Sequence, residues 1–408
     1  MANINSVLKE VLQRYKISDS ETARIKKQAN KIVKLISKSS KLKVAIGGSL
    51  AKGTMISKQV QDVDIFVVFK NEEETKKLES ILNKNFKGKL KLIHGSRDYF
   101  QISGDGVVFE IIPIVDFDSP EQVKNVSDFS LTHVSYIGKK LGKNKKLADE
   151  IKLAKIFCHA QECYGAESYI SGFSGYSLEL LVYYFGSFIK FLKGIDKKRV
   201  IDVEKAFRNE KEIRQELNES KLQSPVILID PTYKYRNACA GLSKETFENF
   251  LEISKKFLKK PNLDFFIKTE IDVEELGKSA RKNKARLSEI KITTDKQEGD
   301  IAGTKMKKFF NFLIMQLEEK GQKILKSEFK YDGKQEARGY IILMEVNEIE
   351  VKGPPVSNKK AIASFKQVRK KIYNRNGFAY AKKEISLDEI FNFVRQISQE
   401  MNVEFEVL

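Results

Sequence analysis

Residues 46–54, IGGSLAKGT, and residues 61–66, QDVDIF, decide the fold. They predict a strand that ends in a Gly-Gly-Ser turn and a second strand that opens on Asp62 and Asp64. Side chains two residues apart on a strand point to the same face, so the two carboxylates lie together. The residues that follow are apolar, as in a buried sheet, and two acids entering such a strand are costly without a cation. The alternative is a solvated strand end.

The Gly-Gly-Ser turn has the composition of a phosphate site. Gly48 and the glycine before it let the backbone turn sharply and approach a ligand closely. The backbone amides and the Ser49 hydroxyl are then expected to face phosphate oxygens at the start of a helix. Lys52, one short turn later, adds a positive charge for the same phosphates.

A third acid, Glu110, lies inside another apolar strand, which is expected over residues 107–115. A single charge there is either strained or functional. If this strand pairs with the strand expected over residues 63–69, Glu110 joins Asp62 and Asp64. Carboxylate oxygens suit Mg²⁺, and three of these groups are able to hold two metal ions about 3.5–4 Å apart. One ion would then activate a hydroxyl and the other would stabilise the leaving group.

The composition points to a polyanionic partner. The chain has 408 residues, of which 41% are apolar, and its 74 Lys and Arg against 55 Asp and Glu give a net charge of +19. Nucleic acid or an acidic membrane surface fits such a surplus. The N-terminus lacks the apolar core of a signal peptide, and the most apolar helix, residues 178–192, is shorter than the ~20 residues that span a bilayer. We therefore expect a cytoplasmic protein with no membrane partner.

The hydrophobic pattern predicts an α+β chain of several domains. The expected parts are a catalytic domain, a mainly helical central domain and an α+β C-terminal region, at residues 1–140, 141–260 and 261–408. In the central domain, Ser174 is expected to cap a helix that runs over residues 175–192. Further on, residues 263–268 are expected to form a strand, and the charged residues 278–300 a loop or an exposed helix.

The Gly-Ser turn, the Asp-x-Asp pair a dozen residues later and the further acid on a strand resemble the signature of the polymerase-beta-like nucleotidyltransferases. Further blocks resemble one branch of that superfamily, the archaeal (class I) CCA-adding enzymes, which are tRNA nucleotidyltransferases. These blocks are Thr132-His133, Lys155, residues 164–167 (YGAE), 172–181 (GFSGYSLELL), 230–231 (DP), 236–238 (RNA) and 353–355 (GPP). The resemblance implies a polymerase-beta-like palm followed by a helical domain and an RNA-binding C-terminal region.

The resemblance also implies a reaction, which is the template-independent addition of CCA to the 3′ end of tRNA from CTP and ATP with release of pyrophosphate. It implies that Asp62, Asp64 and Glu110 bind Mg²⁺ and that Glu110 is the candidate base. The nucleotide-binding positions it implies are Gly48, Ser49, Lys52, His133, Lys155, Tyr164 and Arg236, the last of which would help to read the base. The central and C-terminal domains would bind the acceptor and T arms of the tRNA.

The chain departs from the family pattern in three places. The family usually has Asp at the position of Glu110, and many relatives have Arg at the position of Lys52. Glu adds one methylene, which would shift the metal spacing and lower the rate. Loss of activity is not implied, because Glu is still a hard oxygen ligand. The region after Gly353 looks shorter than in relatives, which predicts a reduced tail on the tRNA-binding body.

Other interpretations stay open at the level of sequence. A structural histidine, a solvated lysine, a core ring and a surface ion pair are the alternatives for His133, Lys155, Tyr164 and Arg236 respectively. The whole chain could instead be another RNA 3′-terminal nucleotidyltransferase of the poly(A) polymerase kind, a catalytically impaired RNA-binding relative, or a protein of the membrane surface. The sequence also leaves open whether the chain forms a homodimer.

Overall fold

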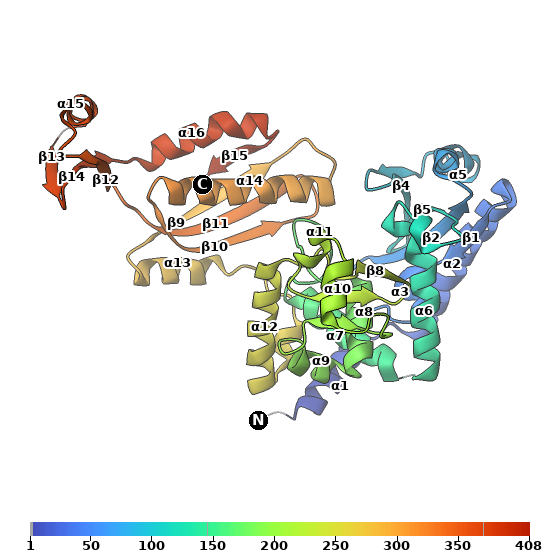
Figure 1. Cartoon of the computed structure of the whole chain (residues 1–408). Coiled ribbons are helices and arrows are strands. Elements are labelled where there is room, and N and C mark those ends of the chain that lie inside the picture. The colour runs from blue at the N-terminus through green and yellow to red at the C-terminus, as the bar shows by residue number, and fades with distance from the viewer. Residues whose placement is uncertain (1–2, 145, 370) are drawn as a thin grey trace. The chain divides into compact units, whose positions relative to one another are not determined.

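The structure, a computed structural model, describes residues 3–144, 146–369 and 371–408. The chain separates into two compact units, Met1–Thr269 and Glu270–Leu408 (Figure 1). Both units combine helices with β-sheets, so the predicted α+β class is confirmed. The finer division into three domains stays a prediction.

A five-stranded sheet organises the N-terminal part of the first unit. Its strands lie in the order β1-β2-β5-β4-β3. Their bounds are Lys43–Ile46 for β1, Gln61–Phe69 for β2, Lys91–Ile93 for β3, Tyr99–Gly104 for β4 and Val107–Val115 for β5. β2 and β5 pair in parallel, and the other pairs are antiparallel. The strand that carries Asp62 and Asp64 therefore lies directly beside the strand that carries Glu110.

The two faces of this sheet have different partners. Odd-numbered residues of β2, such as Val63, are buried in a core with α2 (Asp19–Ser40) and α5 (Leu78–Phe86). Even-numbered residues point to the other face, where α3 (Gly48–Lys52) and α6 (Ser130–Lys143) lie. The side chains of Asp62 and Asp64 therefore leave the sheet on the side away from α2.

The rest of the first unit is mainly helical and surrounds a core rich in phenylalanine. Among the helices that contribute to this core are α1 (Ile4–Arg14), α7 (Lys146–Ala160), α8 (Gly175–Phe185), α9 (Phe188–Gly194) and α12 (Lys244–Lys259). Shorter elements are α4 (Glu72–Thr75), η1 (Pro120–Gln122), η2 (Val126–Phe129), β6 (Val200–Asp202), α10 (Glu210–Glu216), α11 (Glu219–Leu222), β7 (Ile227–Asp230), β8 (Tyr233–Asn237) and η3 (Leu263–Phe266). Fully buried rings, among them Phe157, Phe188 and Phe257, join α7, α9 and α12 into one core.

Two expectations for this helical part are wrong. The single helix expected over residues 175–192 is two helices, because Gly186 adopts a φ of 84° that ends α8, and the Ser187 side chain then caps α9. The strand expected over residues 263–268 is the 3₁₀ helix η3 instead, capped by the Asn262 side chain. The expected cap at the start of α8 is confirmed, since Ser174 Oγ accepts from the backbone N–H of the third helical residue.

A four-stranded sheet in the order β10-β11-β9-β15 forms the centre of the second unit. Its elements are α13 (Val273–Lys282), β9 (Arg286–Thr293), α14 (Asp300–Glu319), β10 (Lys323–Tyr331), β11 (Glu336–Met344), α16 (Leu387–Glu400) and β15 (Glu404–Val407). α14 and α16 bury one face of the sheet and α13 the other. The prediction of a loop or an exposed helix over residues 278–300 is wrong, because strand β9 lies within this segment. Every second residue of β9, such as Ile290, is buried, and the charged residues alternate with them.

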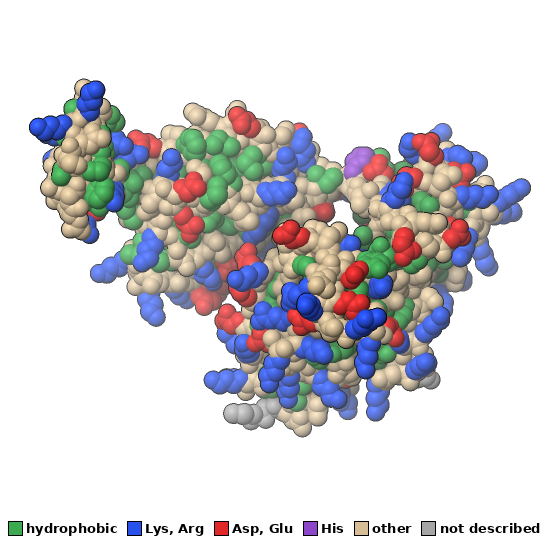
Figure 2. Space-filling view, viewed as in Figure 1, with side chains coloured by type: hydrophobic (Ala, Val, Ile, Leu, Met, Phe, Trp, Pro, Cys, Tyr) green, Lys and Arg blue, Asp and Glu red, His purple; other side chains and the backbone are tan. Residues whose placement is uncertain are grey.

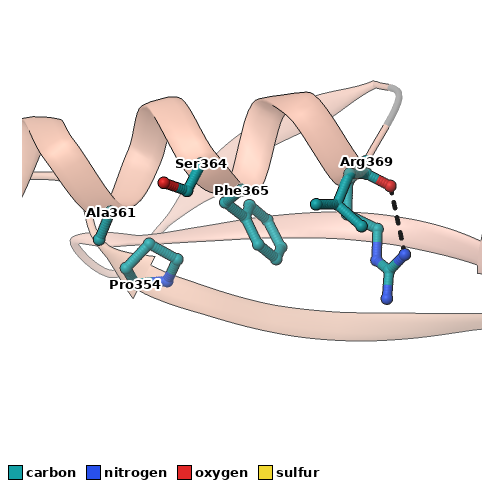
Figure 3. A pocket seen from close by; sticks show the side chains of 6 residues that line it. Pro354, Ala361, Ser364, Phe365 and Arg369 are labelled. Atoms are coloured by element: carbon teal, nitrogen blue, oxygen red, sulfur yellow. Dashed lines mark hydrogen bonds between the residues drawn. The ribbon is translucent and has the colours of Figure 1, made fainter.

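A smaller sheet in the order β12-β14-β13 packs with one helix. Its elements are β12 (Glu348–Pro355), α15 (Lys359–Val368), β13 (Ile372–Arg375) and β14 (Phe378–Glu384). A Cβ at Gly353 would lie 2.6 Å from the Phe365 ring, so glycine is what lets α15 lie this close to β12. Beside this contact lies a hollow of about 550 Å³, where the rings of Pro354 and Phe365 face each other (Figure 3). In the part of the chain that the structure describes, no helix is long and apolar enough to cross a membrane.

Candidate functional site

The first sheet places the three predicted acids on one face. In the parallel ladder between β2 and β5, Asp64 lies beside Glu110, and Asp62 lies beside Val108. Directly paired residues of neighbouring strands share a face, as do residues two apart on one strand. The carboxylates of Asp62, Asp64 and Glu110 therefore project from the same side of the sheet.

Burial and mutual repulsion act on these carboxylates together. Burial raises the pKa of Asp64, and burial together with the charge of Asp64 raises the pKa of Glu110 to about 7. Gln101 Nε2 donates to Glu110 Oε1 over 2.9 Å, and Lys58 Nζ donates to Asp62 Oδ2 over 2.8 Å. The neighbouring donors thus offset only part of the negative charge.

The donor set fits a hard divalent cation in its chemistry. Carboxylate oxygens on one face, two of them from groups with raised pKa values, are ligands whose charge such a cation would neutralise. Within residues 3–144, 146–369 and 371–408, however, no three His, Cys, Asp or Glu side chains come close enough together to hold a metal. Asp62 is paired with Lys58 instead. The acids share a face but do not form a closed ligand cage.

The glycine turn lies against the same carboxylates. Gly48 has a φ of 56°, which glycine adopts readily, and a Cβ on it would lie 1.6 Å from Asp64 Oδ2. The backbone N–H of Gly47 donates to the Asp64 carbonyl over 2.8 Å. The turn is thereby fixed to β2, and α3, which contains Ser49 and Lys52, begins beside the Asp64 side chain.

A buried carboxylate that the sequence analysis did not assign to the site, Glu179, joins two of the predicted nucleotide-binding residues, Lys52 and Lys155. Lys52 Nζ on α3 lies 2.7 Å from Glu179 Oε2, and Lys155 Nζ on α7 lies 2.8 Å from Glu179 Oε1. Thr54 Oγ1 accepts from Lys155 Nζ over 3.0 Å and donates to Glu179 Oε1 over 3.2 Å. The signal in the sequence was an acid within the apolar run LELLV, but its partners lie more than twenty residues away.

The charges of this cluster depend on one another. Burial alone would raise the pKa of Glu179, but the ammonium groups of Lys155 and Lys52 hold it below its ordinary value. Burial lowers the pKa of Lys155, and Glu179 opposes that shift. The cluster therefore keeps two cations close together at the end of the glycine turn.

A second buried carboxylate, Asp230, joins the other predicted nucleotide contacts. His133 Nε2 lies 3.1 Å from Asp230 Oδ2, and Arg236 Nη1 lies 2.6 Å from the same oxygen. The Tyr176 hydroxyl donates to Asp230 Oδ1 over 2.9 Å, and the Tyr176 ring stacks on His133 with the ring centres 3.8 Å apart. Burial lowers the pKa of His133 although Asp230 opposes that shift. Asp230 and Tyr176 belong to the sequence blocks that resemble the CCA-adding enzymes, but the sequence did not show that they contact His133 and Arg236.

Tyr164 precedes α8 in the chain, but its side chain packs against the start of that helix, near Lys155. It forms an isolated parallel bridge with Phe173, and its ring stacks on His159 with the ring centres 3.8 Å apart. A Cβ on Gly175 would lie 2.8 Å from the Tyr164 hydroxyl and 3.9 Å from Lys155 Cε, so both side chains meet over this glycine. α6 packs on both α3 and α8. The structure therefore brings the predicted nucleotide contacts into one region around the carboxylate face.

Comparisons with known proteins give the same combination of parts. The chain matches a family described as "Nucleotidyltransferase domain" over residues 26–127 and one described as "tRNA nucleotidyltransferase, second domain" over residues 149–267. It is 34% identical over 317 residues to the CCA-adding enzyme of Nanoarchaeum equitans, covering 76% of each chain. It is 30% identical over 404 residues to the CCA-adding enzyme of Methanocaldococcus jannaschii, covering 94% of this chain and 88% of the relative. Among solved structures, the Cid1 poly(U) polymerase shares the fold, with a TM-score of 0.52, 12% identity and coverage of 65% of this chain and 98% of its own.

The Glu179 cluster predicts a large loss of stability when its carboxylate is removed. Glu179→Gln leaves the ammonium groups of Lys52 and Lys155 buried without the charge that now pairs with both. Breaking a buried ion pair costs about 3–5 kcal/mol, so we expect the free energy of unfolding to fall by about that amount in urea denaturation. Glu248→Gln, which removes an exposed partner of Lys244 on α12, is the control and should cost less than about 1 kcal/mol. Equal losses in the two variants would contradict the assignment.

The raised pKa of Glu110 predicts a pH-dependent stability in metal-free protein. The folded-state pKa of about 7 lies above the ordinary value of 4.5, so the folded protein binds this proton more tightly than the unfolded chain does. The resulting stabilisation is present below about pH 4.5 and is lost as the pH rises through about 7. Relative to the parent, Glu110→Gln should therefore gain about 2–3 kcal/mol of unfolding free energy between about pH 5 and pH 8, measured in the presence of a chelator. A difference that does not change with pH would show that Glu110 is not held in this environment.

Proposed function

Since this chain belongs to the CCA-adding enzymes, a family of tRNA nucleotidyltransferases, we propose that it adds CCA to the 3′ end of tRNA. CTP and ATP are the nucleotide substrates, and no template is required. The observation that carries this function is the pairing of Asp64 with Glu110 across β2 and β5, beside the turn at Gly48. Family membership and site geometry support the same reaction.

The chemical step is an attack of the terminal tRNA hydroxyl on the α-phosphate of the nucleotide, with pyrophosphate as the leaving group. Asp62, Asp64 and Glu110 are the residues that we assign to Mg²⁺. When bound, the metal would activate the attacking tRNA hydroxyl and neutralise the negative charge on the leaving pyrophosphate. We also assign Glu110 as the candidate base, because it projects beside Asp64 from the same face of the sheet.

The glycine turn and the Glu179 cluster are the parts that we assign to the triphosphate. Gly48 and Ser49 open α3, where backbone amides and a hydroxyl are available to phosphate oxygens. Lys52 and Lys155 add two ammonium groups that Glu179 already orients. Donors that are fixed before the reaction need no reorganisation as charge develops on the phosphates, and this is how such a site lowers the barrier.

The Asp230 cluster and Tyr164 are the parts that we assign to the nucleoside. Asp230 holds one nitrogen of the Arg236 guanidinium. We assign the remaining planar N–H donors of Arg236 to a base edge. His133, kept neutral by burial, is fixed between Tyr176 and Asp230. Tyr164, whose ring stacks on His159 beside the start of α8, is the aromatic residue that we assign to the nucleoside. Each of these roles is part of the proposal.

The proposal extends to partners and location. The basic central and C-terminal parts would bind the acceptor and T arms of the tRNA through phosphates and 2′-hydroxyls. Because tRNA and nucleoside triphosphates are cytoplasmic substrates, we place the reaction in the cytoplasm. Formation of a homodimer stays a hypothesis.

The direct test uses tRNA that ends before CCA, with Mg²⁺ and each of the four labelled nucleoside triphosphates in turn. We expect CTP alone to extend the tRNA by C and then stop, ATP to be added only to tRNA that already ends in CC, and GTP and UTP to be rejected. Long homopolymer tails from ATP or UTP would instead show a poly(A) polymerase or a terminal uridylyltransferase. No incorporation at all, with tRNA binding intact, would show an RNA-binding relative without catalysis.

The metal assignment predicts the behaviour of Asp64→Ala. Removing this carboxylate should lower nucleotide incorporation by at least about 100-fold, because the metal loses a ligand, while tRNA binding stays largely unchanged. Incorporation and tRNA binding are measured on the same preparation. Asp118→Ala, which changes an exposed acid of the same sheet region, serves as control and should keep full activity. Full activity of Asp64→Ala would remove the metal assignment.

A further inference from the structure

The outer surface of α2 carries positive charge that the transfer reaction does not use. The chain contains no Asp or Glu between Glu21 and Asp62, although the whole sequence has 55. The same segment contains ten Lys and Arg. Most of them lie on α2 or directly after it, so the positive charge is concentrated on one element of the fold.

Helical spacing collects four of these lysines into a stripe. The lysine stripe consists of Lys27, Lys31, Lys34 and Lys38, all exposed and spaced by four, three and four residues. This spacing places them on one side of a helix, over about 16 Å of its length. The buried residues of α2 recur with the same spacing and consist of Ile25, Ala29, Ile32 and Ile36. The two sets are about half a turn apart, so the stripe points to solvent directly opposite the core.

The neighbouring helix α5 extends this surface. Asn85 Nδ2 donates to Ser39 Oγ over 3.0 Å, which joins the end of α5 to the end of α2. Lys84 and Lys87, on either side of Asn85, are exposed. Among the described residues, neither they nor the stripe lysines form an ion pair. Figure 2 shows blue side chains projecting from the edge where α2 lies in Figure 1.

Three exposed lysines of α12 differ from the stripe lysines because they are paired with acids. On α12, Lys244, Lys255 and Lys256 are equally exposed, but each has an acidic partner. The partners are Glu248 at 3.7 Å, Asp196 at 3.1 Å and Glu252 at 2.6 Å. Lys244, Lys255 and Lys256 therefore belong to a locally balanced surface, whereas the stripe leaves its charge for an external anion.

The position of the stripe separates it from the nucleotide. α2 covers the face of the sheet that holds the odd-numbered residues of β2, and Asp64 projects from the opposite face. An anion bound by the stripe is therefore neither the triphosphate nor the reacting end of the substrate.

We propose that the lysine stripe of α2, with Lys84 and Lys87, binds the phosphate backbone of RNA at a point remote from the 3′ end that reacts. The choice of RNA rests on the proposed function. A membrane fits poorly, because a helix that lies on a bilayer inserts an apolar face, and the apolar face of α2 is buried against the sheet. None of the residues of α2, all of which the structure describes, is an exposed large apolar side chain.

The test compares two triple variants that remove equal charge. Lys31→Gln/Lys34→Gln/Lys38→Gln removes three of the four stripe lysines, and Lys244→Gln/Lys255→Gln/Lys256→Gln removes three paired lysines of α12. Binding of tRNA lacking CCA is followed by fluorescence anisotropy at several salt concentrations. Because each contacted phosphate contributes about 0.9 to the slope of log affinity against log salt, the stripe variant should lose about tenfold in affinity at low salt and up to about 2–3 in slope. The α12 variant should match the parent.

The outcomes separate this inference from the proposed function. The stripe variant should keep the parent's turnover at saturating tRNA and its KM for CTP, and thermal melting of both variants checks their fold. Parent-like tRNA binding by the stripe variant, or an equal loss in the α12 variant, overturns the inference. Binding of the parent to phosphatidylserine vesicles, lost in the stripe variant while tRNA binding is kept, would assign the surface to a membrane and also overturn it. Failure of CCA addition in the parent, with stripe-dependent tRNA binding, would refute the function alone.

Discussion

The parallel pairing of β2 with β5 is the constraint on which the site depends. It sets Asp64 opposite Glu110 and leaves the odd-numbered residues of β2 for the core under α2 and α5. A shift of the register by one residue would turn Glu110 into that core and Phe109 or Ile111 out of it. The apolar packing of one face therefore fixes the acids on the other. Two strands far apart in the chain present their charges together because the alternative buries a carboxylate among aliphatic side chains.

Two buried carboxylates connect this sheet to the helices. Glu179 is fully buried and contacts Lys52 and Lys155, and Asp230 is fully buried and contacts His133, Arg236 and Tyr176. Ion pairs of this kind add little net stability compared with a well-packed apolar core, but they are costly to break and they specify geometry. Their value here is that each fixes side chains from separate elements in one arrangement. The catalytic sheet and the helical part are thereby held in a defined relation within the first unit.

Sequence alone predicts the parts whose chemistry is local. The strands that carry Asp62, Asp64 and Glu110, the turn at Gly48 and the cap at Ser174 follow from residues that lie next to one another, and the structure contains them. The partners of Glu179 and Asp230 could not be predicted, because a buried acid shows its need for a cation but not which cation meets it. The break at Gly186 was missed because the apolar pattern continues across it, and β9 was missed because its exposed residues are charged. In both cases the tertiary setting, rather than the average composition of the segment, decided the structure.

The shared carboxylate of Glu179 also limits how this unit can move. Lys52 belongs to α3 and Lys155 to α7, and both pair with Glu179 on α8, so pulling α3 away from α7 would break at least one of these buried ion pairs. Any opening that admits a nucleotide and releases pyrophosphate must therefore hinge elsewhere, with α3, α7 and α8 travelling as one rigid block. A single acid in an otherwise apolar helix thus determines which joints of the enzyme are free to bend.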